Sequence, residues 1–227
     1  MATKPSIIIT FKQLATSLIK RSERGTAILL LSDATVEETG TVNVKVYKSV
    51  ADIDENLYTE ENVKHIKNCL AYAPYEVVAI SCNSTKFSDF AKAIVTTRRT
   101  GWIAFVGSDV PQADLASWVK SMELQGHTYK AVGTKAGNDC KQYVYFNQNG
   151  TDRNGNAVLA KNYLSSLLGI LAGCNVNRGC TNFLCTDLAE IKEVDDVDKA
   201  VGSGQLVLAN EVDGVRIVSG INSLVTL

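Results

Sequence analysis

Apolar runs of strand length alternate with segments of helical periodicity along most of the chain before Phe146. Thr26–Leu31, Glu76–Ser81 and Trp102–Val106 are nearly continuous apolar runs, which is typical of strands buried on both faces. Val42–Tyr47 alternates with period two, which predicts a half-exposed strand. Because helical segments of about ten residues lie between these runs, we expect crossover connections and a substantially parallel sheet. The predicted fold class is α/β, with a central mixed sheet and flanking helices.

Three segments between the strands carry apolar residues three and four positions apart, which places each set on one face of a helix. The three sets are Val63, Ile66 and Leu70; Phe87, Phe90, Ile94 and Val95; and Leu115, Trp118, Val119 and Met122. Thr59 is available as the N-cap of the first helix, and Pro111 suits the first turn of the third, which ends at Gly126. Tyr129–Val132 and Gln142–Phe146 are predicted as further strands.

The stretch Asn147–Asn156 is polar or glycine throughout, so it is predicted to be an exposed turn or loop and the best candidate boundary. A helix is expected from about Ala157 to Ala172, with Gly173 at its C-terminal cap. Its apolar stripe consists of Leu159, Tyr163, Leu167 and Leu171. We therefore divide the chain into an N-terminal arm and linker (1–22), an α/β domain (23–150) and a helix plus hairpin (151–227).

The predicted hairpin lies near the C-terminal end. Gln205–Ala209 and Val215–Ser219 are short apolar runs, and they flank a turn that contains Asp213-Gly214. This dipeptide between two apolar runs is a strong hairpin signal.

Charge and hydropathy narrow the classes of function. Lys and Arg number 23 and Asp and Glu 24, so the net charge of −1 provides no field that attracts nucleic acid or an anionic membrane. No apolar run approaches the roughly 18 residues that span a bilayer, and the N-terminus lacks the apolar region of a signal peptide. We therefore expect a cytoplasmic protein without a nucleic-acid partner and without membrane insertion by this chain.

Six cysteines occur, at positions 69, 82, 140, 174, 180 and 185. None forms a Cys-x-x-Cys pair, and the spacings of six and five between the last three do not match a zinc site. A chain of this length does not need disulfides to support its core. The cysteines are predicted to be reduced, partly buried thiols that bind no metal.

The residues that enzymes use are sparse. The chain has neither a Gly-x-Ser-x-Gly elbow nor a Gly-x4-Gly-Lys-Ser/Thr phosphate loop. His65 lies within a helical period and His127 follows a turn, so both are predicted to face solvent. Asp195, Asp196 and Asp198 lack the spacing of a calcium loop and are expected to cap a short helix. We predict no catalytic, cofactor-binding or metal-binding residues.

The two ends of the chain carry more specific patterns. The N-terminal pattern consists of Pro5, Ile7, Ile9, Phe11 and Lys12, followed by Arg21, Arg24 and Gly25. The C-terminal pattern begins with Leu171, Ala172 and Gly173 and continues with Gly204, Leu206 and Leu208. It ends in what we call the signature: Arg216, Ile217, Gly220, Asn222, Ser223 and Leu224. Together these patterns resemble the tail sheath proteins of contractile bacteriophages and phage-like particles, of the PBSX-like and clostridial type.

The resemblance implies a structural subunit that stacks as hexameric rings around a tail tube and contracts to drive the tube through a target envelope. It implies no cofactor, and its implied partners are other sheath subunits and the tail tube protein. The implied location is the cytoplasm of the producing bacterium and then the assembled phage or bacteriocin-like tail. Sheath proteins continue beyond the Asn-Ser-Leu signature into a C-terminal domain. We therefore expect a truncated subunit that is monomeric when isolated.

The N-terminal segment is expected to be an inter-subunit arm made of Ile7, Ile8, Ile9, Thr10 and Phe11. In a strand, Ile7, Ile9 and Phe11 project to one face and the other two residues to the opposite face. Such a strand binds the edge of a partner's sheet through main-chain hydrogen bonds. The alternative is a first strand within the chain's own sheet.

Two other functions remain open. One is an enzyme of unknown type on a flavodoxin-like core, and the other is a small tail adaptor protein. A cluster of perturbed titratable groups at the C-terminal ends of strands 76–81 and 102–106 would favour the enzyme.

Overall fold

The structure is a computed structural model that describes residues 24–36, 41–106, 113–136, 138–220 and 222–225. The predicted arm, Ile7–Phe11, and the predicted helix start at Pro111 lie outside the described residues.

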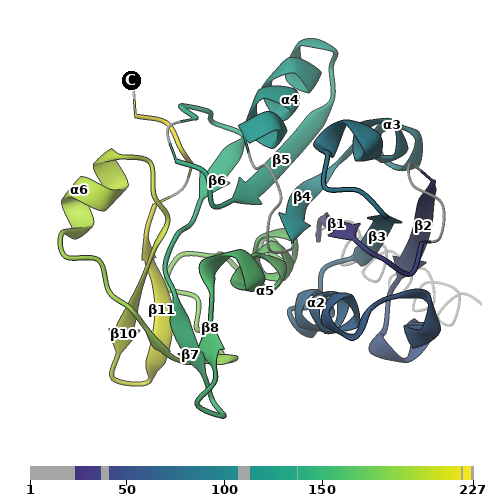
Figure 1. Ribbon diagram of the computed structural model, residues 1–227. Helices are drawn as coiled ribbons and strands as arrows, with labels where there is room; N and C mark the ends of the chain where they lie inside the picture. Colours follow the sequence, from purple (N-terminus) through teal and green to yellow (C-terminus); the bar gives the residue numbers. More distant parts are fainter. Residues whose placement is uncertain (1–23, 37–40, 107–112, 137, 221, 226–227) are drawn as a thin grey trace, which may run out of the picture.

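A six-stranded sheet with the order β2-β3-β1-β4-β5-β6 forms the centre of the molecule (Figure 1). Its strands are β1 (Thr26–Ser32), β2 (Val42–Tyr47), β3 (Glu76–Cys82), β4 (Thr100–Val106), β5 (Thr128–Gly133) and β6 (Tyr143–Tyr145). All neighbouring pairs are parallel except β2 and β3, which are antiparallel. The predicted mixed sheet is therefore confirmed, and the predicted half-exposed strand is its antiparallel edge.

Helices cover both faces of this sheet (Figure 1). The two helices on one face are α2 (Glu60–Ala71) and α5 (Ala160–Ala172), and those on the other are α3 (Phe87–Thr97) and α4 (Ala113–Leu124). Leu29 and Leu31 of β1 pack in the core beneath α2 and α5, whereas Ile28 and Leu30 pack in the core beneath α3 and α4. Alternate side chains of one strand thus supply two cores, which explains why β1 is apolar throughout.

The remaining elements lie beside the central sheet. A three-stranded sheet has the order β8-β7-β9, and its strands are β7 (Gly150–Asp152), β8 (Ala157–Val158) and β9 (Leu188–Ile191). The predicted hairpin is present as β10 (Val207–Glu211) and β11 (Gly214–Ser219), and it follows α6 (Val197–Gly202). Two short 3₁₀ helices, η1 (Val50–Asp52) and η2 (Glu55–Leu57), precede α2.

The loop predicted over Asn147–Asn156 is wrong in part, because this stretch contains β7 and the turn of a β7–β8 hairpin. The turn forms because the carboxylate of Asp152 accepts hydrogen bonds from the backbone N–H groups of Asn154 and Asn156, both at 2.8 Å. Polar side chains that bond their own backbone stabilise tight turns as well as loops. The sequence pattern did not distinguish these two outcomes.

The predicted start of the long helix is also corrected. Ala157–Val158 forms β8, and α5 begins at Ala160, whose N–H donates to the Asn149 side chain at 2.9 Å. Leu159 is the N-cap residue and is 44% exposed, so it is not part of the buried stripe. The remainder of α5 is buried almost all round, in one core with β1, β4 and α2. The two parts of the chain on either side of residue 150 therefore share one hydrophobic core.

His65 is buried, with 4% of its surface exposed, so the prediction of a solvent-facing residue is wrong. It lies on α2 where this helix packs against α5, and its Nδ1 is 3.1 Å from Oγ of Ser165. Burial lowers the pKa of His65, because the charged ring is poorly solvated there. The helical period of α2 predicts one buried face. It does not predict that α5 covers His65 as well, because that contact comes from a distant part of the chain.

The cysteines agree with the prediction of free thiols. All six are unpaired in disulfides; Cys69, Cys82, Cys140 and Cys185 are buried, and Cys174 and Cys180 are half-buried. Within the described ranges, no group of three His, Cys, Asp or Glu residues is arranged to hold a metal ion. In the same part of the chain, no helix is long and apolar enough to cross a bilayer.

Asp33 joins the end of β1 to the start of α2. Its carboxylate accepts hydrogen bonds from the N–H and hydroxyl of Thr35, the N–H of Thr59 and the side-chain amide of Asn62, at 2.7 to 3.0 Å. Burial alone would raise the pKa of Asp33, but the bonds from Asn62, Thr35 and Thr59 outweigh it and lower the pKa below its usual value. The charged carboxylate is therefore part of the fold.

Gly169→Ala should lower the free energy of unfolding by about 1–3 kcal/mol. A Cβ at Gly169 would lie 2.3 Å from the carbonyl oxygen of Cys69, so α2 and α5 would have to separate. The gain in helix propensity, about 1 kcal/mol, does not offset this clash. The matched control is Gly202→Ala, where a Cβ meets nothing within 4 Å. Urea unfolding of both variants checks the prediction, and equal effects would contradict it.

Asp33→Asn should cost about 1–3 kcal/mol at neutral pH, because an amide donor replaces one accepting oxygen. Since the folded pKa lies below the unfolded value of about 3.9, the stabilisation is present above that pH. It is lost as the pH falls through the folded pKa, so the two proteins should converge in acid. Urea unfolding over a pH series measures this difference. The control is Asp54→Asn at an exposed position, which should change the free energy of unfolding by about 0.5 kcal/mol or less at every pH. If the difference in unfolding free energy between Asp33→Asn and the wild type did not change with pH, the prediction would be wrong.

Candidate functional site

The predicted signature residues lie on β11 and on the segment that follows it. Arg216 projects from β11, and its guanidinium donates to both carboxylate oxygens of Asp213 at 3.0 and 2.5 Å. A third bond, at 2.5 Å, reaches the carbonyl oxygen of Asn182. Arg216 therefore connects the turn of the hairpin to the cysteine-rich stretch before β9.

Ile217 is 1% exposed and belongs to the core that contains α5. Its N–H donates to the carbonyl of Phe183 at 3.1 Å, and its carbonyl accepts from the N–H of Asn182 at 2.8 Å. The N–H of Cys185 donates to the carbonyl of Val215 at 2.8 Å. The stretch Asn182–Cys185 thus lies along β11 like an added strand, opposite β10.

Gly220 allows two backbone segments to cross closely. Its φ is +94°, and a Cβ there would lie 2.5 Å from the carbonyl oxygen of Gln205. Gly204 faces the same crossing from the other side, with a φ of +80° and only 2.8 Å from its Cβ position to Cα of Ser223. Both positions need glycine, because of the left-handed backbone and the lack of space.

Ser223 fastens the end of the signature to the edge of the central sheet. Its N–H donates to the carbonyl of Tyr143 at 2.8 Å, and its Oγ donates to the carbonyl of Cys140 at 3.0 Å and accepts from the Cys140 N–H at 3.2 Å. Asn222 accepts the N–H of Leu224 at 3.1 Å, which closes a turn. The signature therefore caps the outer edge of β6.

The signature residues make two separate sets of contacts: Arg216 and Ile217 hold the stretch 182–185 along β11, and Gly220 and Ser223 hold the segment after β11 against Gln205 and the edge of β6. The second set forms the joint between the hairpin and the sheet. Leu206, from the strand region before β10, completes it by donating its N–H to the carbonyl of Tyr145 at 2.7 Å. The sequence pattern located these residues but did not indicate what they contact. Their partners, Asn182, Tyr143 and Cys140, come from distant parts of the chain.

A polar pocket of about 400 Å³ lies between α2, α5 and the β7–β8 turn. Tyr163 and Tyr72 both donate their hydroxyl groups to Oδ1 of Asp187, at 3.1 and 2.5 Å. Tyr163 and Asp187 line the pocket together with His65. Burial, with the nearby Asp187 charge, raises the pKa of Tyr72, so the hydroxyl remains protonated and donates. The sequence analysis missed this network, because its residues are far apart in the chain and follow no motif.

In the central sheet, β1 lies between β3 and β4, the two strands whose C-terminal ends were named as a test of the enzyme hypothesis. The carboxylate at the end of β1, Asp33, already accepts four hydrogen bonds from its own fold. A group with this role has no accepting position left for a substrate proton. Residues 107–112, which follow β4, lie outside the described part of the chain.

Comparison with known proteins gives one similar curated sequence. No protein-family model matches the chain. The tail sheath protein of Clostridium phage phiCD119 is 25% identical over 241 aligned residues, which cover 100% of this chain and 65% of that protein. The chain thus spans about two-thirds of the length of this relative.

Solved structures share the fold at low sequence identity. The sheath tail protein of Listeria innocua has a TM-score of 0.74 at 13% identity, covering 90% of this chain and 70% of its own. The sheath tail protein of Desulfitobacterium hafniense gives 0.72 at 12%, covering 90% and 73%. The helical sheath of the anti-feeding prophage in its contracted state gives 0.64 at 10%, covering 86% and 61%. The similarity in sequence, which runs along the whole chain, confirms the resemblance predicted from the two ends, and the shared fold agrees with it: the chain is similar to a tail sheath protein of a Clostridium phage.

Proposed function

We propose that this chain is a structural subunit of a contractile tail sheath and not an enzyme. The observation that carries the proposal is the similarity to the Clostridium phage tail sheath protein, which runs along all of this chain. The fold shared with the contracted sheath of the anti-feeding prophage supports it. In this proposal, subunits stack as six-membered rings around a tail tube, with other sheath subunits and the tube protein as partners.

Contraction in this proposal needs no nucleotide, metal or other cofactor. The work comes from the relaxation of a metastable assembly into a more stable one, so the subunit must stay folded while its contacts change. The two-sided core of the central sheet suits such a part, because side chains packed at interior density resist deformation. The proposed location is the producing bacterium's cytoplasm and then the assembled tail.

The proposed link between subunits is the N-terminal arm, Ile7–Phe11, as part of the segment 1–22. Three or four main-chain hydrogen bonds contribute roughly 1 kcal/mol each, and three buried apolar side chains about 1.5–3 kcal/mol each. Association costs on the order of 4–15 kcal/mol, so one joint is marginal. Within a ring, later joints form at high effective concentration and become favourable.

The signature has a different proposed role, which is to hold the end of segment 151–227 against segment 23–150. The hydrogen bonds of Ser223 to Cys140 and Tyr143 cross between the two segments, as does the bond from Leu206 to Tyr145, and Gly220 lets the backbone pass Gln205 beside them. Such a joint transmits force between the hairpin and the central sheet, because neither backbone can move without breaking hydrogen bonds. This role explains why glycine and serine are needed there.

The proposal is tested by producing the complete subunit that contains this chain together with its tail tube protein and examining the pellet by electron microscopy. Tubes surrounded by regularly repeating sheath density are expected. A single ring at one end of each tube would instead identify a tail adaptor. A chain that never sediments with tubes, yet is folded by circular dichroism, would contradict the proposal.

In the complete subunit, Ile9→Pro should leave the fold intact and block sheath assembly. Proline removes a ladder donor and disrupts strand pairing, whereas an arm outside the subunit's core adds little to its stability. Ile9→Val is the control, because it keeps the strand and should assemble. Thermal unfolding and electron microscopy are measured on the same preparations. A melting midpoint lowered by several degrees in Ile9→Pro would show an internal strand and not an arm.

Ser223→Ala should weaken the signature joint by about 1–3 kcal/mol, because it leaves the backbone groups of the buried Cys140 without their partner. Hydrogen exchange at the amides of Ser223 and Leu206 should accelerate before exchange in β1 does. Leu224→Ala is the control, since Leu224 is 42% exposed and should cost about 0.5 kcal/mol or less. Unchanged exchange at both amides would contradict the proposed joint.

A further inference from the structure

Two of the six cysteines lie at the ends of a tight turn that follows α5. Asn175 and Arg178 exchange backbone hydrogen bonds across this turn, at 2.9 and 3.1 Å, and the Asn175 side chain accepts the N–H of Asn177 at 2.8 Å. The chain therefore reverses direction directly after Cys174 and returns alongside it. The residue brought back is Cys180.

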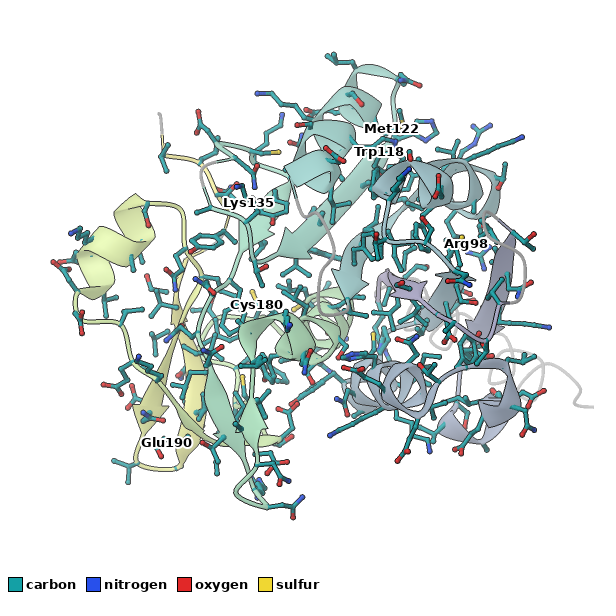
Figure 2. The ribbon with its side chains drawn as sticks, in the orientation of Figure 1. Arg98, Trp118, Met122, Lys135, Cys180 and Glu190 are labelled. Atoms are coloured by element: carbon teal, nitrogen blue, oxygen red, sulfur yellow. The ribbon has the colours of Figure 1, made fainter. Side chains whose placement is uncertain are left out.

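Both thiols line one pocket of about 350 Å³, next to the end of α5. Figure 2 labels Cys180 beside this helix. Lys130 lines the same pocket and contributes a positive charge, whereas Lys141, also in the lining, pairs with Glu123 at 2.7 Å. Cys174 and Cys180 are only half-buried, whereas the other four cysteines are buried. A small molecule from solvent can therefore reach both thiols in this pocket.

The two thiols face the same pocket, and the Cys174 thiol donates to the carbonyl of Ile170 at 3.3 Å. The neighbouring Cys174 lowers the pKa of Cys180 to about 6, and the charge of Lys130 acts in the same direction. The proximity of Cys180 raises the pKa of Cys174. At neutral pH, Cys180 is therefore the thiolate and Cys174 the thiol that supports it.

The buried thiols differ in this respect. Burial raises the pKa of Cys69, and it raises that of Cys185 to about 11. Thiols protonated in an apolar environment are poor nucleophiles. The contrast is useful for an experiment, because one chain holds both the reactive pair and its internal controls.

We propose that Cys174 and Cys180 are a redox-active thiol pair that closes to a disulfide on reaction with a low-molecular-weight disulfide such as oxidised glutathione. The Cys180 thiolate attacks one sulfur, and the first glutathione leaves as a thiolate. Cys174 gives its proton to water and attacks Cys180, which releases the second glutathione. Two protein thiols are oxidised, and one disulfide is reduced to two thiols.

The closed pair connects two structural elements. Cys174 directly follows α5, and Cys180 directly precedes the stretch whose Asn182 and Phe183 pair with Ile217 of β11. A disulfide between them closes the turn and holds the path from α5 to the hairpin. The inference rests on the pocket and the turn, and it does not depend on the proposed sheath function.

Mass spectrometry of the folded chain tests the proposal directly. Trypsin cleaves after Arg178, so Cys174 lies on peptide 162–178 and Cys180 on peptide 179–192. After incubation with oxidised glutathione and digestion without reductant, the two peptides should be joined, two hydrogens lighter than their sum. Cys185 is on the second peptide as well, so Cys185→Ser should keep the joined pair and Cys180→Ser should abolish it.

Alkylation by iodoacetamide over a pH series provides the second measurement. In the wild-type chain, Cys180 should react with a midpoint near pH 6 and far faster than Cys69. Cys174→Ser should still fold by circular dichroism and should shift this midpoint upward. If a serine variant does not fold, the wild-type labelling decides. Equal labelling of Cys180 and Cys69, or joined peptides that persist in Cys180→Ser, would overturn the proposal.

Discussion

The close packing of α5 against α2 is the contact on which the rest of the structure depends. A side chain at Gly169 would meet the backbone of Cys69, so the two helices touch along their main chains. This contact places α5 in the core of the central sheet, with β1 and β4 beneath it. The later elements β9, α6 and the β10–β11 hairpin follow α5 in the chain, so the position of α5 fixes where they begin. The hairpin and its signature are therefore positioned by a helix that the central sheet holds.

The second joint closes the structure at the other end. The signature returns the chain to β6 through backbone hydrogen bonds and close crossings, and it uses few large side chains. Gly204 and Gly220 let the two segments approach, and Ser223 satisfies both backbone groups of Cys140. A joint built in this way is rigid, because any shift leaves buried polar groups unsatisfied. For a subunit that is proposed to transmit force through many copies, rigidity of this kind matters more than a binding pocket.

Two carboxylates that each accept several hydrogen bonds serve the fold. Asp33 anchors the start of α2, and Asp187 accepts two tyrosine hydroxyls between α2, α5 and the segment before β9. Reactivity is concentrated in the half-buried pair of Cys174 and Cys180. There a turn, a shared pocket and the charge of Lys130 create a chemical environment that the four buried cysteines lack.

Local patterns in the sequence determined the elements of the central sheet, the hairpin and the resemblance carried by both ends. They succeeded because strand alternation, helical period and turn residues act over a few neighbouring positions. The tertiary structure alone decided that His65 is buried, that polar residues after Asn149 form a hairpin, and that α5 shares the core of the central sheet. It also decided which two of six cysteines meet. Each of these outcomes depends on a partner far away in the chain, and local spacing contains no information about such partners.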